Sequence, residues 1–87
     1  FYGRPPRRYV FVRTSVESVP VADRVAFARR QHDLAVAPGG RFILCHYRNT
    51  GEEPVDPGEV LECAGLRPVG RTEAPGVLVA WCDRAAS

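Results

Sequence analysis

The chain has 87 residues, enough for one small domain, and 45% of them are hydrophobic, which excludes general disorder. Its net charge of +2 is too small to indicate nucleic-acid binding by itself. No apolar run approaches the roughly 20 residues that cross a bilayer, and no secretory signal opens the sequence, so we expect a cytoplasmic protein with no membrane partner.

The first predicted element is a buried strand at residues 9–12, Tyr-Val-Phe-Val. β-Branched and aromatic residues without polar alternation are typical of a strand with both faces covered, as in a parallel sheet. Arg4, Arg7 and Arg8 precede it among aromatic residues, a composition that also fits an arm contacting phosphates. We favour a solvated lead-in to the strand and expect no nucleic-acid partner.

A helix is predicted next, followed by a second strand. Apolar and small residues recur at helical spacing on a face made by Val21, Val25, Ala28, His32 and Ala35. We expect His32 to be partly buried and hydrogen-bonded. Pro38 and the Gly39-Gly40 pair are expected to stop the helix and to turn the chain into a buried strand at residues 42–45.

Local signals for a second helix follow a polar loop at residues 49–55. Asp56 suits the N-cap, Pro57 suits the first helical position, and Glu59 suits a capping box. Gly65 is expected to close this helix.

The last two predicted elements are strands. Pro68 and Gly70 should confine the strand at 66–72 to an edge of the sheet, whereas the run at 77–82 is continuous. The short link between them predicts an antiparallel hairpin. The order strand, helix, strand, helix, strand, strand predicts an α/β protein, a Rossmann-like half-sheet that is mostly parallel with an antiparallel last strand.

The three cysteines, Cys45, Cys63 and Cys82, do not indicate a metal site. They lack the Cys-x-x-Cys spacing of zinc ligands, and each lies in or beside an apolar segment. We expect all three to be buried thiols in a reducing compartment.

Four segments in this order resemble the C-terminal half of a class I S-adenosylmethionine-dependent methyltransferase: "RPPRRYVFVRTSVESVP", "LAVAPGGRFILCHYR", "PGEVLECAGLRPVGRTE" and "GVLVAWC". The resemblance covers residues 4–83 and implies that residues 1–87 form a single partial domain. It implies S-adenosylmethionine as the cofactor and a small molecule, which the sequence does not identify, as the methyl acceptor.

Two departures from that family limit what the chain is expected to do alone. The family's Gly-rich cofactor loop has no counterpart, since no G-x-G-x-G pattern occurs in the 87 residues. Val10 stands where the family often has Asp. We therefore expect one side of a cofactor crevice, the N-terminal half being absent, and no methyltransferase activity from 87 residues alone.

The candidate site residues follow the first two strands. Nucleotide cofactors bind doubly wound sheets at the carboxyl ends of the strands. The resemblance implies that Arg13, Thr14 and Ser15, after the first strand, lie on the cofactor side.

The second strand ends in residues whose side chains could act on or contact a substrate. His46 or Tyr47 would accept a proton from the methyl acceptor, and Arg48 would contact the substrate.

A different class of function stays open. The half-domain would then be a non-catalytic interaction module, because its first strand would present a bare apolar edge. Such an edge recruits another strand, from a second copy or from the missing N-terminal half.

Overall fold

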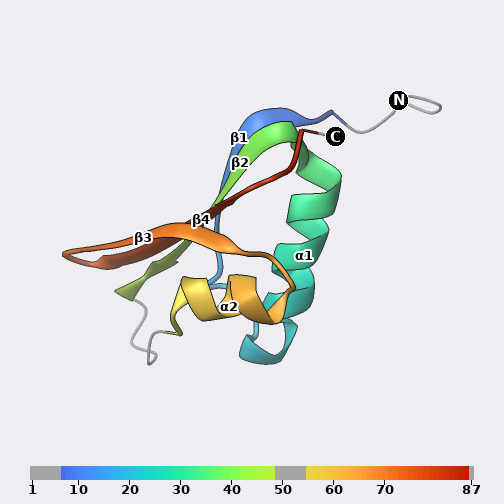
Figure 1. Ribbon diagram of the computed structural model, residues 1–87. Coiled ribbons are helices and arrows are strands. Elements are labelled where there is room, and N and C mark those ends of the chain that lie inside the picture. The colour runs from blue at the N-terminus through green and yellow to red at the C-terminus, as the bar shows by residue number, and fades with distance from the viewer. Residues whose placement is uncertain (1–6, 49–54, 87) are drawn as a thin grey trace.

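The computed structural model describes residues 7–48 and 55–86. Its elements are β1 (Tyr9–Ser15), the 3₁₀ helix η1 (Val21–Asp23), α1 (Arg24–Ala35), β2 (Val36–Tyr47), α2 (Pro57–Cys63), β3 (Pro68–Ala74) and β4 (Val77–Asp83) (Figure 1). The predicted order of strands and helices is confirmed. Arg4 of the basic arm and most of the predicted polar loop lie outside the described residues.

The strands form one mixed sheet in the order β1-β2-β4-β3. β1 and β2 are parallel, whereas β4 is antiparallel to both β2 and β3. The predicted hairpin and reversed last strand are confirmed, but the prediction of a mostly parallel sheet is wrong. β4 occupies the place beside β2 that a second parallel strand would have taken. β3 lies at the edge of the sheet, where Pro68 and Gly70, which weaken its hydrogen bonding to a neighbouring strand, are tolerated.

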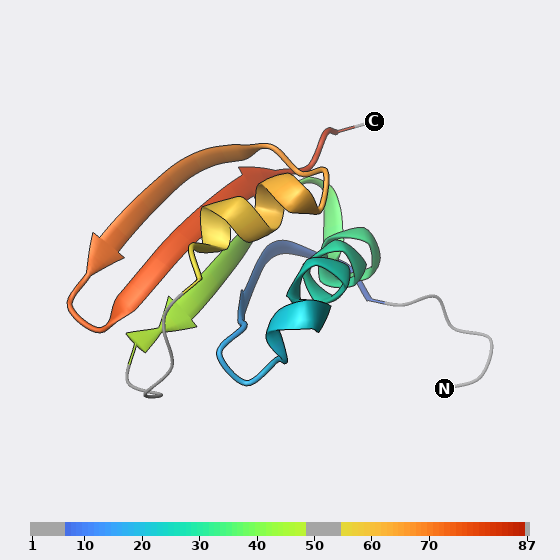
Figure 2. The same cartoon turned by 90° about the horizontal axis from the view of Figure 1, so that it is seen from below.

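Both helices cover the same face of the sheet, and the core lies between them and the strands (Figure 2). Alternate residues of β2 and β4 point to this face, so Phe42, Leu44, Ala80 and Cys82 are all buried there. The remaining core residues are Val16, Ala28, Val36, Val60, Leu61, Ala64 and Leu66.

The apolar face predicted for the first helix is only partly correct. α1 begins at Arg24, and Val21 lies before it in a 3₁₀ turn, so the face predicted for one continuous helix does not form. Val21 is 61% exposed and Val25 is 36% exposed. Arg24 is instead buried, and its Nε donates to the Val19 carbonyl at 2.9 Å. A long side chain with an aliphatic stem is thus buried in this helix, whereas two of the predicted valines are exposed.

The Pro-Gly-Gly segment lies inside β2, so the prediction that it stops the helix is wrong: α1 already ends at Ala35. Between Tyr9 and Phe11 of β1, the paired residue of β2 moves from Val36 to Arg41. Gly39 has a positive φ of 80°, and a Cβ on Gly40 would lie 2.7 Å from the Val10 carbonyl oxygen. Glycines are therefore needed at both positions, because β2 bulges here and its backbone passes close to that of β1.

β1 is not buried on both faces, contrary to the prediction from its sequence. Tyr9, Val10 and Phe11 are 49%, 62% and 69% exposed. The cause is the topology: β1 ends the sheet on one side, and both helices lie on one face.

The ends of α2 match the local signals. The Asp56 side chain accepts a hydrogen bond from the Gly58 N–H at 2.9 Å, with Pro57 at the first position. At the other end Gly65 has a φ of 78°, and the Leu66 N–H donates to the Leu61 carbonyl at 2.9 Å, as in a Schellman motif.

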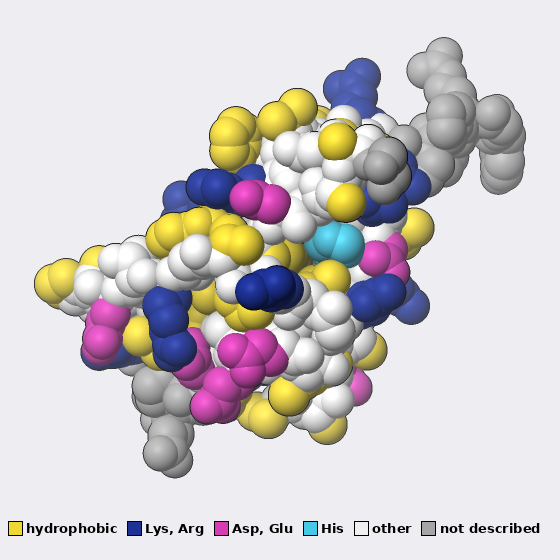
Figure 3. Space-filling model, in the orientation of Figure 1, with side chains coloured by type: hydrophobic (Ala, Val, Ile, Leu, Met, Phe, Trp, Pro, Cys, Tyr) yellow, Lys and Arg dark blue, Asp and Glu magenta, His cyan; other side chains and the backbone are white. Residues whose placement is uncertain are grey.

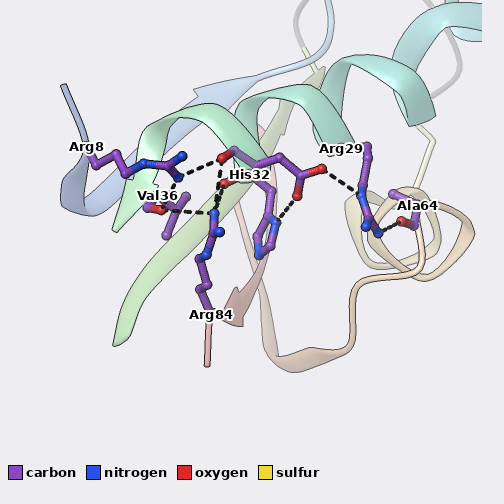
Figure 4. Close-up of polar contacts among 7 residues, drawn as sticks. Arg8, Arg29, His32, Val36, Ala64 and Arg84 are labelled. Atoms are coloured by element: carbon purple, nitrogen blue, oxygen red, sulfur yellow. Dashed lines mark hydrogen bonds and ion pairs between the residues drawn. The ribbon is translucent and has the colours of Figure 1, made fainter. Parts of the chain in front are cut away.

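Arginines from three parts of the chain gather at the last turn of α1 (Figure 4). Arg84 donates to the carbonyls of His32, Asp33 and Val36 at 3.1–3.2 Å, and Arg8 donates to that of Asp33 at 2.7 Å. Cations stabilise the negative end of a helix and satisfy carbonyls that have no partner within it. His32 itself is partly buried and contacts the Asp33 carboxylate at 2.9 Å, which confirms its predicted state.

Two of the three cysteines are buried as predicted. Cys45 and Cys82 lie in the sheet, but Cys63 is exposed on α2, so that part of the prediction is wrong. Burial and the neighbouring Asp83 carboxylate raise the pKa of the Cys82 thiol to about 11. Neither α1 nor α2 is long and apolar enough to span a membrane.

We predict that Gly70→Ala destabilises the protein by about 1–3 kcal/mol. A Cβ at residue 70 would lie 2.2 Å from Cζ2 of Trp81, so the indole ring must move. Urea denaturation followed by far-UV circular dichroism measures the stability in any background, and Trp81 fluorescence reports the movement of the ring, since Trp81 is the single tryptophan. In the Trp81→Leu background the same change should cost clearly less; an equal cost in both backgrounds would contradict the assigned clash.

We predict that Arg84→Ala lowers the free energy of unfolding by about 1–2 kcal/mol, because three carbonyls at the end of α1 lose a charged donor. Arg30→Ala, at an exposed position of the same helix, is the matched control and should change stability by less than about 0.5 kcal/mol. Equal losses in the two variants would show that the cap contributes nothing.

Candidate functional site

The carboxyl ends of β1 and β2 form a shallow hollow. Because the two strands are parallel, with Ser15 beside Cys45, both end at the same edge of the sheet. An open hollow of about 330 Å³ lies there, lined by Arg13, Thr14, Ser15 and Tyr47. The three residues predicted for the cofactor side and one of those predicted for the acceptor therefore lie together.

Arg13 and Tyr47 are joined across the two strands by a hydrogen bond from the Arg13 guanidinium to the Tyr47 hydroxyl oxygen. Hydrogen bonds to the side chains of Tyr47 and Cys45 raise the pKa of Arg13, so its charge is permanent. The Tyr47 oxygen acts as acceptor in this pair, which leaves its own O–H free to donate. The hollow thus presents a guanidinium and three hydroxyl groups, of which the Ser15 hydroxyl already donates to Glu17.

Glu17 does not line the hollow but is hydrogen-bonded to two of the residues that do, a role that the sequence did not indicate. Its Oε1 accepts from the Tyr47 backbone N–H at 3.2 Å, which ties the loop after β1 to the end of β2. Burial disfavours the Glu17 carboxylate, but hydrogen bonds from the Ser15 side chain and the Tyr47 N–H outweigh this and lower its pKa. A single acid in a polar loop has no pattern that would have identified it.

His46 and Tyr47, both predicted to accept a proton, lie on opposite faces of β2. Side chains alternate along a strand, so Tyr47 reaches the hollow while His46 points to the face covered by helices. His46 is fully buried, and within the part of the chain that the structure describes its two ring nitrogens have no hydrogen-bond partner. It does not line the hollow.

Arg48, predicted to contact a substrate, is held at the hairpin. Its guanidinium forms an ion pair with Glu73 of β3, and its backbone N–H donates to the Gly76 carbonyl at 2.9 Å. It does not line the hollow either.

The described residues form no metal site, and charges of both signs share the surface. Across residues 7–48 and 55–86, no group of three His, Cys, Asp or Glu side chains could hold a metal ion. Acidic and basic side chains alternate on the face shown in Figure 3. Ion pairs join Arg29 to Asp33, Arg41 to Asp83 and Arg71 to Asp56, so much of the positive charge is locally balanced.

The comparisons with known proteins bear on the fold. No protein-family model matches the chain, and no curated protein does. Among solved structures, the chain is similar to a protein from Pseudomonas syringae described as a "putative Methyltransferase", with a TM-score of 0.58 and 16% sequence identity. The match covers 93% of this chain and 51% of that one, so the chain spans about half the length of its structural neighbour. The chain therefore has the fold of one part of that protein.

We predict that Glu17→Gln lowers stability at neutral pH and flattens its dependence on pH. The pKa of Glu17 is lowered from the ordinary 4.5, so its carboxylate stabilises the fold above that pH. This contribution is lost as the pH falls through the lower, folded-state pKa. Urea midpoints measured from about pH 7 to pH 3 test this.

Glu62→Gln, at an exposed position of α2, is the matched control for that series. A Glu17→Gln variant whose stability tracks that of the control at every pH would show that the contact with Tyr47 is not stabilising.

Proposed function

We propose that the chain is part of an S-adenosylmethionine-dependent methyltransferase of class I type, and that it forms one wall of the crevice for cofactor and substrate. The observation that carries the proposal is the hollow at the carboxyl ends of the parallel pair β1 and β2, which is where nucleotide cofactors bind in such sheets. The likeness in fold to the protein described as a "putative Methyltransferase" supports it. The other wall would come from further polypeptide.

The groups around the hollow suit a cofactor that carries a carboxylate and sugar hydroxyls. Arg13, Thr14 and Ser15 offer a cation and two hydroxyls, and the Glu17 carboxylate accepts hydrogen bonds. When bound, S-adenosylmethionine would supply an activated methyl group on a sulfonium, so the protein would mainly align donor and acceptor.

Of the residues proposed for the methyl acceptor, Tyr47 has the most direct role. It lines the hollow, and its O–H is free to orient an acceptor oxygen or nitrogen or to relay its proton. Arg48 would reach a small-molecule substrate once its pairing with Glu73 is released.

The proposal is tested by titrating the chain with S-adenosylhomocysteine while recording amide NMR spectra, which detect binding in the millimolar range. We predict shifts confined to residues 13–17 and 46–48, and their loss in Arg13→Ala. Arg30→Ala, distant on α1, should leave the shifts unchanged. Shifts centred on α2 or β3, or none at millimolar ligand, would contradict the proposal.

A second candidate function is supported by a separate observation. β1 ends the sheet with three exposed apolar residues, Tyr9, Val10 and Phe11. The half-domain would then act as a non-catalytic interaction module that assembles through this strand.

A further inference from the structure

The hydrogen-bonded ladder between β1 and β2 ends just before Tyr47. Its last registered pair is Ser15 with Cys45, and the Val16 N–H then donates to the Cys45 carbonyl at 3.0 Å. If the ladder continued, the Val16 carbonyl would accept from the Tyr47 N–H. That carbonyl instead accepts from the Val19 N–H at 2.9 Å, because the chain turns away from the sheet after β1. The Tyr47 N–H therefore needs a different acceptor.

The Glu17 side chain supplies that acceptor. Its Oε1 lies 3.2 Å from the Tyr47 backbone nitrogen, so a carboxylate takes the place of the Val16 carbonyl in the ladder. The same carboxylate accepts from the Ser15 side chain, and Ser15 lines the hollow from β1 as Tyr47 lines it from β2. One side chain therefore holds both sides of the hollow together, although it does not line the hollow itself.

The surroundings of Glu17 favour its ionised form. Burial raises the pKa of Glu17, but hydrogen bonds from Ser15 and the Tyr47 N–H, together with the charge of the His46 imidazole, lower it, and the lowering prevails. The charged or titratable groups on the elements around it are Arg13 of β1, His46 and Tyr47 of β2 and Arg24 of α1, which donates to a carbonyl of the same turn. The carboxylate is thus a charged acceptor at neutral pH.

We propose that Glu17 is a positioning residue for the ligand of the hollow, because its ionised carboxylate sets the spacing between Ser15 and Tyr47. The inference rests on the proposed function only for the choice of ligand. An ionised acceptor forms a stronger hydrogen bond than a neutral one, so protonation of Glu17 should loosen the two sides of the hollow. The affinity for the ligand should then fall in acid.

Linkage distinguishes this role from a purely structural one. A ligand that binds better when Glu17 is ionised must in return make Glu17 harder to protonate. Binding should therefore lower the pKa of Glu17 still further below the ordinary 4.5. A residue that stabilised only the fold would titrate in the same way with and without the ligand.

Amide hydrogen exchange in the ligand-free chain tests the ladder contact. We expect the Tyr47 amide to exchange at least about tenfold faster in Glu17→Ala than in the wild type, because it loses its acceptor. The Val16 amide, whose acceptor is the Cys45 carbonyl, is the matched control and should keep its protection. A Tyr47 amide that is equally protected in both chains, or a loss of protection shared by Val16, would overturn the proposal.

Titration with S-adenosylhomocysteine, followed by amide NMR spectra, tests the effect on the ligand. We expect Glu17→Ala to raise the dissociation constant about three- to tenfold at pH 7. Glu17→Gln keeps the reach of the side chain without its charge, so it should remove the loss of affinity that the wild type shows as the pH falls below 4.5.

Arg84→Ala is the matched control for stability, because Arg84 donates to the Val36 carbonyl at the other end of β2. This variant should bind S-adenosylhomocysteine as the wild type does. Equal weakening of binding in Arg84→Ala and Glu17→Ala would show that only the stability of the fold matters, and would overturn the positioning role.

The positioning role and the methyltransferase proposal fail separately. If the wild type binds no S-adenosylhomocysteine at millimolar concentration, the methyltransferase proposal falls, and exchange of the Tyr47 amide still shows whether Glu17 holds the two sides of the hollow. If the wild type binds with a dissociation constant that neither Glu17 variant changes, only the positioning role falls.

Discussion

The arrangement of this protein depends on how the carboxyl end of α1 is satisfied. Its last carbonyls accept hydrogen bonds from Arg8, which leads into β1, and from Arg84, which follows β4. From the same helix, Arg29 donates to the Ala64 carbonyl at the end of α2 at 2.9 Å. These charged donors replace the partners that a helix end lacks, and they connect segments far apart in the sequence. α1 is thereby fixed over the parallel strands whose ends form the hollow.

The chemistry of the hollow follows from strand direction and side-chain alternation. Parallel pairing brings the ends of β1 and β2 to one edge, and alternation sends Arg13 and Tyr47 to the face without helices. Glu17 then bridges the two ends through the Tyr47 backbone. The same alternation places His46 in the core, although it is adjacent in sequence to Tyr47. A cation, hydroxyls and an ionised acid within one small area can recognise a polar ligand of mixed charge.

Features encoded over a few residues could be predicted from the sequence, whereas those that depend on distant partners could not. The Asp56-Pro57 cap and the Gly65 stop are local, and both were correctly predicted. The burial of Val10 depends on what lies beside β1, and the placement of β4 depends on competition between strands for one edge of β2. The membership of Arg13, Thr14, Ser15 and Tyr47 in one hollow was accessible because strand ends are predictable in a parallel pair. Glu17 was missed because its partner is a backbone N–H thirty residues away.

The insertion of β4 between β2 and β3 also constrains the order in which the chain can fold during synthesis. β2 pairs along its whole second half with the last strand, from Arg41 beside Asp83 to Tyr47 beside Val77. β2 ends at Tyr47 and β4 begins only at Val77, so the backbone groups on this side of β2 have no partner until the last strand has been made. Closure of the sheet is therefore a late event, after translation has passed residue 83.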